Sequence, residues 1–502
     1  MSLSRVRSVA LQGIDGHLID IELDMNDGLP TFTLLGLPDS ALNEAKDRVR
    51  SALINSGVPW PNRKIVLSLS PAWLPKGGSG FDIAIATAIF LAQSGGREIL
   101  DSIWIGELAL DGQIRPVRGV LPSLLAARRE GVTRAYIPSE NYWEAAAIDG
   151  ITLFPLRHFH EIKDLLETGS YIPQVPPRTD SEIAATLDLS DVAGQAKARR
   201  SLEIAAVGGH HLLFIGPPGT GKTMLAERIP TILPSLSAEE SLEVSAIHSL
   251  VGDGNRNHLL PPFVAPHHSI THVAMIGGGA HGIKPGAVSL AHNGVLFIDE
   301  APEAATVTLD ALRQPLESGV VTISRAIGTC VFPARFILVL AANPCPCGKY
   351  TGRGRGCTCS SLQIRRYLGR LSGPLLDRID IRIFVEPPSR IELESQELGE
   401  SSSVVRERVL RSRAQMHERF SEFSWSSNSA IPAKYLRKIF AAERSAMNFL
   451  HAELDREHIS ARGFHKILRV AWSICDSRAG VRPTREDVEE AYLMREGLDL
   501  IA

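Results

Sequence analysis

The 502-residue sequence predicts an α/β protein in three segments, with a parallel sheet at its centre. The first segment, residues 1–172, mixes short alternating apolar stretches with helical ones. The second, residues 182–386, holds short and almost continuous apolar runs between helices, a pattern typical of parallel strands covered on both faces. The third, residues 404–502, has few strand signals and indicates a bundle of helices.

The elements follow in order along the chain. In the first segment the periodicity predicts strands at 17–23 and 64–69 and helices at 40–56, 82–92 and 120–130. A polar, proline-bearing stretch at 173–181 indicates a linker. The second segment is predicted to have strands at 211–215, 294–298 and 336–342 and a hairpin at 320–332. The third is predicted to have helices at 404–420, 433–454 and 461–477.

Composition sets few limits on function. Hydrophobic residues make up 44% of the chain and the formal net charge is −3, so a nucleic-acid contact has to depend on local charge. The first twelve residues carry arginines but no long apolar stretch follows them, which argues against a signal peptide. The longest apolar run, residues 83–92, is too short to span a bilayer. We therefore expect a cytoplasmic protein with no membrane partner.

Residues 216–223 match the pattern G-x-x-x-x-G-K-[ST] between a predicted strand and a predicted helix at 223–228. The glycines let backbone N–H groups curve around phosphate oxygens, and the lysine reaches the β- and γ-phosphates. The final threonine can ligate Mg²⁺. The pattern predicts a phosphate site made of Gly216, Pro217, Pro218, Gly219, Thr220, Gly221, Lys222 and Thr223.

Two carboxylates, Asp299 and Glu300, follow the apolar strand at 294–298. The carboxyl ends of parallel strands meet at one edge of a sheet, so both are expected beside the phosphate loop. Asp299 would hold Mg²⁺, directly or through water, and Glu300 would polarise the attacking water. An apolar strand that ends in two acidic residues is by itself weak evidence for a catalytic site. When it follows a phosphate loop in the sequence, it indicates nucleotide hydrolysis.

Four of the six cysteines lie between residues 345 and 359. In a reducing compartment such a cluster favours a metal over disulfides, and four thiolates suit a tetrahedral Zn²⁺ ion. The spacing is C-x-C and not the usual C-x-x-C, so four free thiols or a redox pair stay as alternatives. We predict a zinc site made of Cys345, Cys347, Cys357 and Cys359.

With these motifs the chain resembles the AAA+ superfamily of ring-forming ATPases. Residues 188–195, which include Val192, resemble the segment that contacts adenine, and Asn343 matches the sensor that helps to place the lytic water. Residues 375–380 resemble the arginine-finger segment, so Arg378 would reach the γ-phosphate of a neighbouring subunit. Arg462, after the candidate helix cap Ser460, matches the second sensor. A surface ion pair is the alternative for each arginine.

The resemblance narrows to the magnesium-chelatase-like proteins of the ComM/YifB family. It extends over nearly the whole chain, through motifs at 36–39, 48–57, 80–82, 277–279, 285–286, 291–300, 312–317, 343–348 and 372–380. The best-understood members resemble hexameric helicases that drive branch migration of DNA in homologous recombination, notably in natural transformation. The resemblance implies ATP and Mg²⁺ as cofactors, and DNA and further copies of the chain as partners.

The first segment also resembles the proteolytic domain of Lon, whose fold is like that of ribosomal protein S5 domain 2, at 74–80 and 106–119. A Ser–Lys dyad needs an amine beside the hydroxyl to accept its proton. The position expected for the serine falls on Gly80 and that for the lysine on Leu121, while Ser79 is one place away. We therefore expect a non-catalytic binding or docking domain.

Local charge suggests where DNA would bind. Residues 349–382 include eight basic side chains against two acidic ones. The related helicases place a hairpin such as 320–332 in the central pore, and we expect the glycine-rich loop at 277–286 nearby. The candidate phosphate contacts are Lys284, Arg325, Arg353 and Arg355. Solvated loops or subunit packing are the alternative.

Three functions stay open at this point. The first is a ring translocase that moves DNA junctions, and the second is a chelatase- or chaperone-like motor that remodels a protein partner without DNA. The third is a recruitment module in which ATP only sets assembly. DNA-stimulated ATP hydrolysis with a steep salt dependence would separate the first from the other two.

Overall fold

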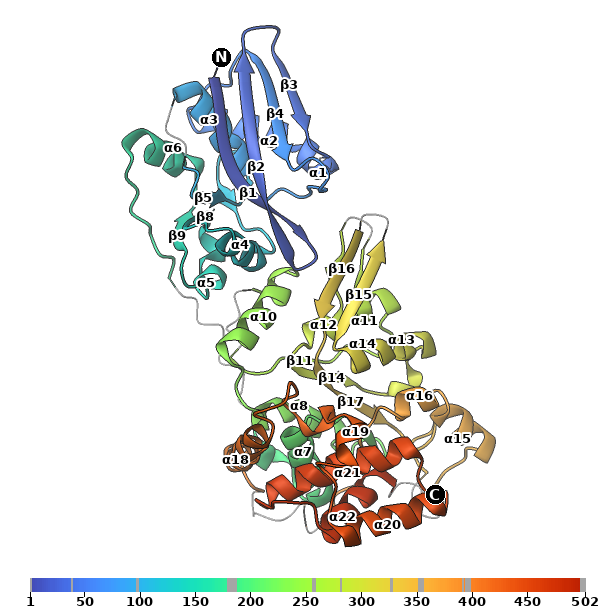
Figure 1. The fold of residues 1–502 in the computed structure, drawn as a ribbon. Coiled ribbons are helices and arrows are strands. Elements are labelled where there is room, and N and C mark those ends of the chain that lie inside the picture. Colours follow the sequence, from blue (N-terminus) through green and yellow to red (C-terminus); the bar gives the residue numbers. More distant parts are fainter. Residues whose placement is uncertain are drawn as a thin grey trace.

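The computed structural model describes residues 2–37, 39–95, 99–177, 187–254, 259–279, 282–325, 328–350, 356–390, 392 and 399–496. These residues form an N-terminal α/β part, a core built on a parallel sheet, and a C-terminal helical part that packs on the core (Figure 1). The predicted α/β class with a central parallel sheet is confirmed.

The N-terminal part has two main sheets. The first has the order β1 (Ser2–Gln12), β2 (Asp15–Asn26), β4 (Lys64–Ser70), β3 (Thr31–Leu35), and within it β3 and β4 are parallel. The second is parallel and contains β5 (Ser102–Trp104), β8 (Arg134–Pro138) and β9 (Thr152–Leu156). A short hairpin, β6 (Glu107–Leu108) and β7 (Ile114–Arg115), lies between β5 and β8 in sequence.

The helices of this part are α1 (Ser40–Asn43), α2 (Ala45–Asn55), α3 (Asp82–Ser94), α4 (Val120–Arg129), α5 (Tyr142–Ala145) and α6 (Phe159–Thr168). The predicted helix at 40–56 is therefore broken at Glu44. Every residue of α3 from Asp82 to Ala92 is buried, so the longest apolar run of the sequence is a core helix. Among the described helices, none combines the length and the apolar character that crossing a bilayer requires.

The central sheet has the order β11 (Phe263–Val264), β14 (Gly294–Ile298), β17 (Phe336–Ala342), β10 (Leu212–Ile215), β18 (Ile381–Phe384), and all its pairs are parallel. Residues of β14 and β17 are almost entirely buried, as their continuous apolar sequences predict. The helices of the core are α7 (Ala196–Gly208), α8 (Lys222–Glu227), α9 (Ile229–Ile232), α10 (Ala238–Ser249), α11 (His272–Ile276), α12 (Ala287–Leu290), α13 (Thr306–Asp310), α14 (Arg313–Ser318), α15 (Ser361–Leu368) and α16 (Gly373–Leu376).

Two hairpins project from the core. The predicted one is confirmed as β15 (Val320–Arg325) and β16 (Gly328–Pro333), and it points toward the N-terminal part (Figure 1). The second, β12 (Gly277–Gly278) and β13 (Lys284–Pro285), lies where the sequence indicated only a glycine-rich loop. A Cβ at Gly13, in the β1–β2 turn, would lie 2.9 Å from Cβ of Cys330 in β16, so the larger hairpin packs against that turn.

The C-terminal helices are α18 (Ser402–Arg419), α19 (Ala433–Leu436), α20 (Arg444–Asp455), α21 (Ala461–Ser477) and α22 (Arg485–Glu496). The hydroxyl of Ser460 accepts a hydrogen bond from the Gly463 amide at 3.1 Å, so it caps α21 as predicted. The predicted single helix at 433–454 is wrong. Phe440 lies between α19 and α20, is 3% exposed, and its carbonyl accepts from Trp472 Nε1 at 2.8 Å. That tertiary contact favours a broken helix.

Candidate active site

The phosphate loop connects the end of β10 to the start of α8. Gly219 and Gly221 have φ of +77° and +84°, a region that side chains with a Cβ rarely adopt. Lys222 Nζ donates to the carbonyl oxygens of Gly216 at 2.7 Å and Pro217 at 2.8 Å. Burial lowers the pKa of Lys222, and the carboxylates that follow β14 oppose that shift. The loop thus surrounds one ammonium group with oxygen acceptors, whose place phosphate oxygens can take.

Three other predicted residues meet this loop because their strands end at the same edge of the sheet. Asn343 follows β17, and its Oδ1 accepts from Lys222 Nζ at 3.3 Å. Asp299 follows β14, and its Oδ2 accepts from the Thr223 hydroxyl at 2.7 Å. A hydroxyl beside a carboxylate is the hard oxygen pair that suits Mg²⁺. The structure therefore brings these side chains together, and their individual roles stay predictions.

Glu300 has left-handed backbone geometry, with φ of +49°, and its amide donates to Asp299 Oδ1 at 2.8 Å. Its carboxylate faces a residue that the sequence analysis did not single out, because His268 Nδ1 lies 3.4 Å from Glu300 Oε2. Gln195 is the last residue of the predicted adenine segment, and its Nε2 donates to the carbonyls of Thr220 at 3.3 Å and Glu386 at 2.5 Å. Val192 is 4% exposed and its side chain packs in the core, so its adenine contact stays a prediction.

The two predicted arginines lie away from the phosphate loop of their own chain. Arg378 precedes β18, whereas the phosphate loop follows β10, and these two strands are parallel neighbours. Each strand has four residues, so about 13 Å of sheet separates the edge with Arg378 from the edge with the phosphate loop. Arg378 donates to the Pro374 carbonyl at 2.6 Å and to the carboxylate of Glu317. Arg462, on α21, donates to Asp377 at 2.9 Å, beside Arg378. Both arginines therefore lie at the amino edge of the sheet, which is the edge where its parallel strands begin.

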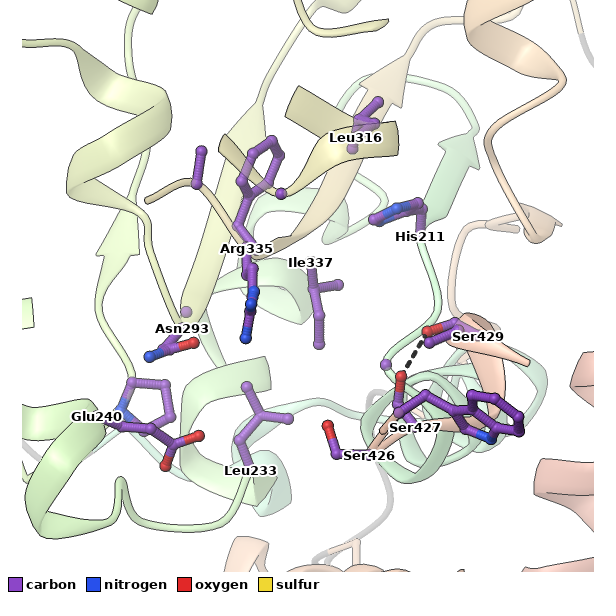
Figure 2. A pocket seen from close by; sticks show the side chains of 18 of the residues that line it. His211, Leu233, Glu240, Asn293, Leu316, Arg335, Ile337, Ser426, Ser427 and Ser429 are labelled. Atoms are coloured by element: carbon purple, nitrogen blue, oxygen red, sulfur yellow. Dashed lines mark hydrogen bonds between the residues drawn. The ribbon is translucent and has the colours of Figure 1, made fainter. Parts of the chain in front are cut away.

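That amino edge is hollow. A cavity of about 680 Å³ opens between the core and the C-terminal helices, with His211, Asn293, Leu316, Arg335 and Ser427 in its lining (Figure 2). A smaller cavity of about 380 Å³ shares His211 and Leu316 with it and is lined by both arginines. The face that carries Arg378 and Arg462 is thus concave in the single chain.

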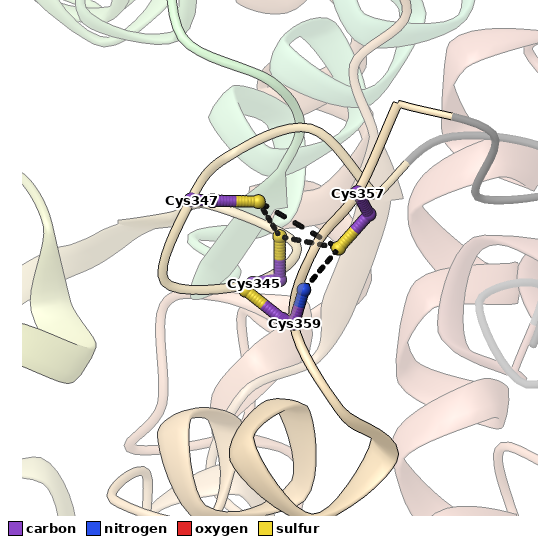
Figure 3. Close-up of side chains that lie close together, drawn as sticks. All are labelled: Cys345, Cys347, Cys357 and Cys359. Atoms are coloured by element: carbon purple, nitrogen blue, oxygen red, sulfur yellow. Dashed lines mark hydrogen bonds between the residues drawn. The ribbon is translucent and has the colours of Figure 1, made fainter.

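The four predicted cysteine ligands converge after β17 (Figure 3). Sγ of Cys345 lies 3.3 Å from that of Cys347 and 3.6 Å from that of Cys357, and all four sulfur atoms lie within 4.8 Å of one another. Tetrahedral zinc with Zn–S bonds of about 2.3 Å would put its sulfur ligands about 3.8 Å apart. Backbone N–H donation from Lys349 lowers the pKa of Cys347 to about 6, whereas burial raises the pKa of Cys357. The donor set fits Zn²⁺.

Comparisons with known proteins cover almost the whole chain. Family models described as magnesium chelatase subunit ChlI match residues 21–141 and 188–393, and the model of its C-terminal part matches residues 399–495. The chain is 45% identical to an uncharacterized protein of Mycobacterium tuberculosis over 99% of both chains. It is 42% identical to the uncharacterized protein YifB of Escherichia coli, over 99% of this chain and 97% of YifB. It is 41% identical to the competence protein ComM of Haemophilus influenzae, over 95% and 94% of the two chains.

The chain belongs to the magnesium-chelatase-like ComM/YifB family. A stretch that makes up 31% of this ComM/YifB-family chain is also 29% identical to part of the Lon protease of Rhizobium meliloti. At the Lon-like loop the Ser79 hydroxyl donates to the carboxylate of Glu107. Lys76 Nζ instead donates to the carbonyl of Gly36 at 3.0 Å, and Leu121 is fully buried. These contacts supply Ser79 with no amine base.

Two of the candidate DNA contacts in this ComM/YifB protein share one surface. Lys284 in β13 pairs with Gly278 in β12, and a Cβ at Gly278 would lie 3.2 Å from a guanidinium nitrogen of Arg325. Lys284 and Arg325 are both exposed. The other two candidates, Arg353 and Arg355, lie outside the described residues.

Metal analysis of the purified protein is expected to give about one zinc ion per chain. A Cβ at Gly348 would lie 2.6 Å from Cδ of Pro218, so the cysteine loop packs on the phosphate loop and metal loss should also slow ATP turnover. Cys357→Ser should lose the zinc, whereas Cys475→Ala, which removes a buried thiol elsewhere, should retain it. A metal-free and fully active preparation would disprove the site.

Proposed function

We propose that the chain is an AAA+ ATPase that forms a hexameric ring and acts on DNA, as a helicase or translocase that promotes branch migration in homologous recombination or natural transformation. The observation that carries the proposal is the convergence of Lys222, Thr223, Asp299 and Asn343 at one edge of the sheet, with Glu300 adjacent. Family membership supports the ATPase activity.

Each of these side chains has a distinct task in the proposed reaction. Lys222 would exchange its carbonyl partners for the β- and γ-phosphates of ATP. Mg²⁺ held by Thr223 and Asp299 would neutralise charge that develops on the phosphates. Glu300 would orient a water molecule and accept its proton, and Asn343, fixed by Lys222, would help to place that water. Hydrogen bonds within the single chain already join Lys222 to Asn343 and Thr223 to Asp299.

The position of the arginines supports a ring. Arg378 and Arg462 lie at the amino edge, across the sheet from their own phosphate loop, and therefore complete a site only when a second chain brings its loop to them. The concave surface around both arginines gives such a neighbour room to enter. We propose a hexamer because the chain resembles hexameric members of its family.

Two observations support DNA as the substrate. Lys284 and Arg325 form an exposed basic pair on neighbouring hairpins, suited to the phosphates of a strand. The relative from Haemophilus influenzae carries the name competence protein, which supports a role in competence here. The alternative is a chelatase-like ATPase that remodels a protein, and the description of the matching family models favours that alternative.

ATP turnover with and without forked or four-way DNA tests the choice. We expect DNA to stimulate hydrolysis, with a stimulation that weakens as salt rises because phosphate contacts release counterions. Turnover that no DNA structure changes would make the protein-remodelling motor the better proposal.

The double variant Lys284→Ala/Arg325→Ala is expected to bind DNA more weakly regardless of sequence. Each lost phosphate contact should flatten the plot of log affinity against log salt by about one unit. The variant Arg353→Ala/Arg355→Ala tests the cysteine loop in the same way. Arg456→Ala removes a 65% exposed charge just after the end of α20 and serves as the control. Wild-type affinity with an unchanged slope in the first variant would exclude the hairpins as the DNA contact.

A further inference from the structure

An exposed apolar cluster lies at the end of the N-terminal sheet where β3 and β4 finish. It consists of Trp73, Leu37 and Leu35, which are 69%, 60% and 48% exposed. Leu35 is the last residue of β3 and pairs with Ser68 near the end of the parallel strand β4. Leu37 follows β3 and Trp73 follows β4, so the three side chains share one end of the sheet.

Hydrogen bonds hold the two loops of this cluster together. The amide of Lys76 donates to the Leu37 carbonyl at 3.3 Å. The buried ammonium group of Lys76 donates to the carbonyls of Gly36 and Pro71, one in each loop. Leu37 has φ of +54°, a region that residues other than glycine rarely adopt. A constrained backbone therefore displays a large apolar side chain to solvent, and such constraint favours a role in binding.

The first β-hairpin of the chain places Trp73 beside the core. The rings of Trp73 and His17 meet edge to face, with centroids 6.3 Å apart and an interplanar angle of 74°. His17 lies in β2, two residues or about 7 Å of strand from the last pair of that hairpin, Gln12 and Asp15. The turn after this pair reaches the core beside β15 and β16 (Figure 1). There a Cβ at Gly328, the first residue of β16, would lie 2.5 Å from Nε2 of Gln12.

The same end of the N-terminal sheet meets the basic pair on the core hairpins. Arg325 is paired with Gly328 at the end of β15. The two residues that follow Trp73 line a cavity of about 180 Å³ together with Lys284 and Gly328. An exposed indole and two exposed cations therefore flank one junction between the N-terminal part and the core. Surfaces that bind single-stranded nucleic acids combine these groups, because cations contact the phosphates and aromatic rings stack on the bases.

We propose that Trp73 is a base-stacking residue for single-stranded DNA, in a site that the N-terminal part shares with the core hairpins. Lys284 and Arg325 contact the phosphates of the strand, the indole stacks on a base, and Leu35 and Leu37 extend the apolar surface beside it. Stacking needs a base with a free face, so the site distinguishes an unpaired strand from a duplex. The inference rests on the proposed action on DNA, and it gives the N-terminal part a binding role.

The experiment measures the affinity for an oligo(dT) strand and for a blunt duplex, over a range of salt, in the wild type and three variants. Trp73→Ala should bind oligo(dT) about 5- to 150-fold more weakly, the effect of losing one base–aromatic stack. Its salt dependence should not change, because no phosphate contact is lost. Its affinity for the duplex and its ATP turnover without DNA should equal those of the wild type.

Two further variants serve as the comparison. Trp73→Phe retains an aromatic ring and should recover part of the affinity for oligo(dT). Leu29→Ala is the matched control, because Leu29 is an 85% exposed leucine between β2 and β3, at the opposite end of the same sheet. It should bind both DNAs as the wild type does.

Wild-type affinity of Trp73→Ala for oligo(dT) would overturn the stacking role and leave the action on DNA intact. An equal loss of affinity for both DNAs, or a loss of DNA-free ATP turnover, would show that Trp73 supports the fold and does not contact a base. A smaller assembly of Trp73→Ala in sedimentation, with unchanged affinity for oligo(dT), would assign the cluster to a contact between copies of the chain. If the wild type binds neither DNA, the proposed substrate is wrong and the stacking role is wrong with it.

Discussion

Lys222→Ala is expected to abolish nucleotide binding, whereas Glu300→Gln should bind ATP normally and lose hydrolysis by about 10²- to 10⁴-fold. Lys222 is the ammonium that the phosphate loop surrounds, so its removal takes away the charge that the β- and γ-phosphates need. The glutamine at position 300 retains the size of the side chain but cannot accept a proton. Equilibrium binding of a fluorescent ATP analogue and steady-state turnover measure the two effects.

Glu303→Gln is the matched control for Glu300→Gln. Glu303 lies three residues further along, and its carboxylate is paired with Arg370 at 3.1 Å. It should hydrolyse ATP at nearly the wild-type rate. Normal turnover in Glu300→Gln would remove the role assigned to Glu300, and tight ATP binding by Lys222→Ala would remove that of the lysine.

The part of this site that could be predicted from sequence is the part that local patterns determine. Strands β14 and β17 have the predicted bounds because each is a continuous apolar run that ends in a polar residue. Because these strands are parallel, the polar residues that follow them lie at the same edge of the sheet. Asn343 and Asp299 lie at that edge, in contact with Lys222 and Thr223 respectively.

The contacts that escaped prediction depend on tertiary placement. Strand β11 has two residues, too few to show a period, so nothing in the sequence put His268 beside Glu300. The break between α19 and α20 depends on Phe440 and Trp472, which are distant in the chain. The pairing of Arg462 with Asp377 likewise requires knowing where α21 packs on the core.

The segment that carries Arg378 is bound by a lysine of α21, which bears on the proposed role of Arg378. Lys466 Nζ, on α21, donates to the Arg378 carbonyl at 3.1 Å and lies 2.7 Å from the fully buried carboxylate of Asp380. Burial opposes ionisation of Asp380, but Lys466 and His210 outweigh it and keep its pKa well below the usual range. A buried charge pair of this kind fixes one geometry at a cost in desolvation. It presents Arg378 on the concave amino edge in a defined position.

Arg378→Ala is accordingly expected to bind ATP but to hydrolyse it more slowly by about 10³- to 10⁵-fold, the range measured for arginine fingers elsewhere. Because the residue lies across the sheet from its own phosphate loop, the loss should be repaired in trans. A mixture of Arg378→Ala and Lys222→Ala should regain activity, since the intact loop of the first chain meets the intact arginine of the second. Each variant alone at the same total concentration is the control. Arg462→Ala should complement in the same way, because it shares that face. Full activity in a dilute and demonstrably monomeric wild-type sample would contradict the shared site.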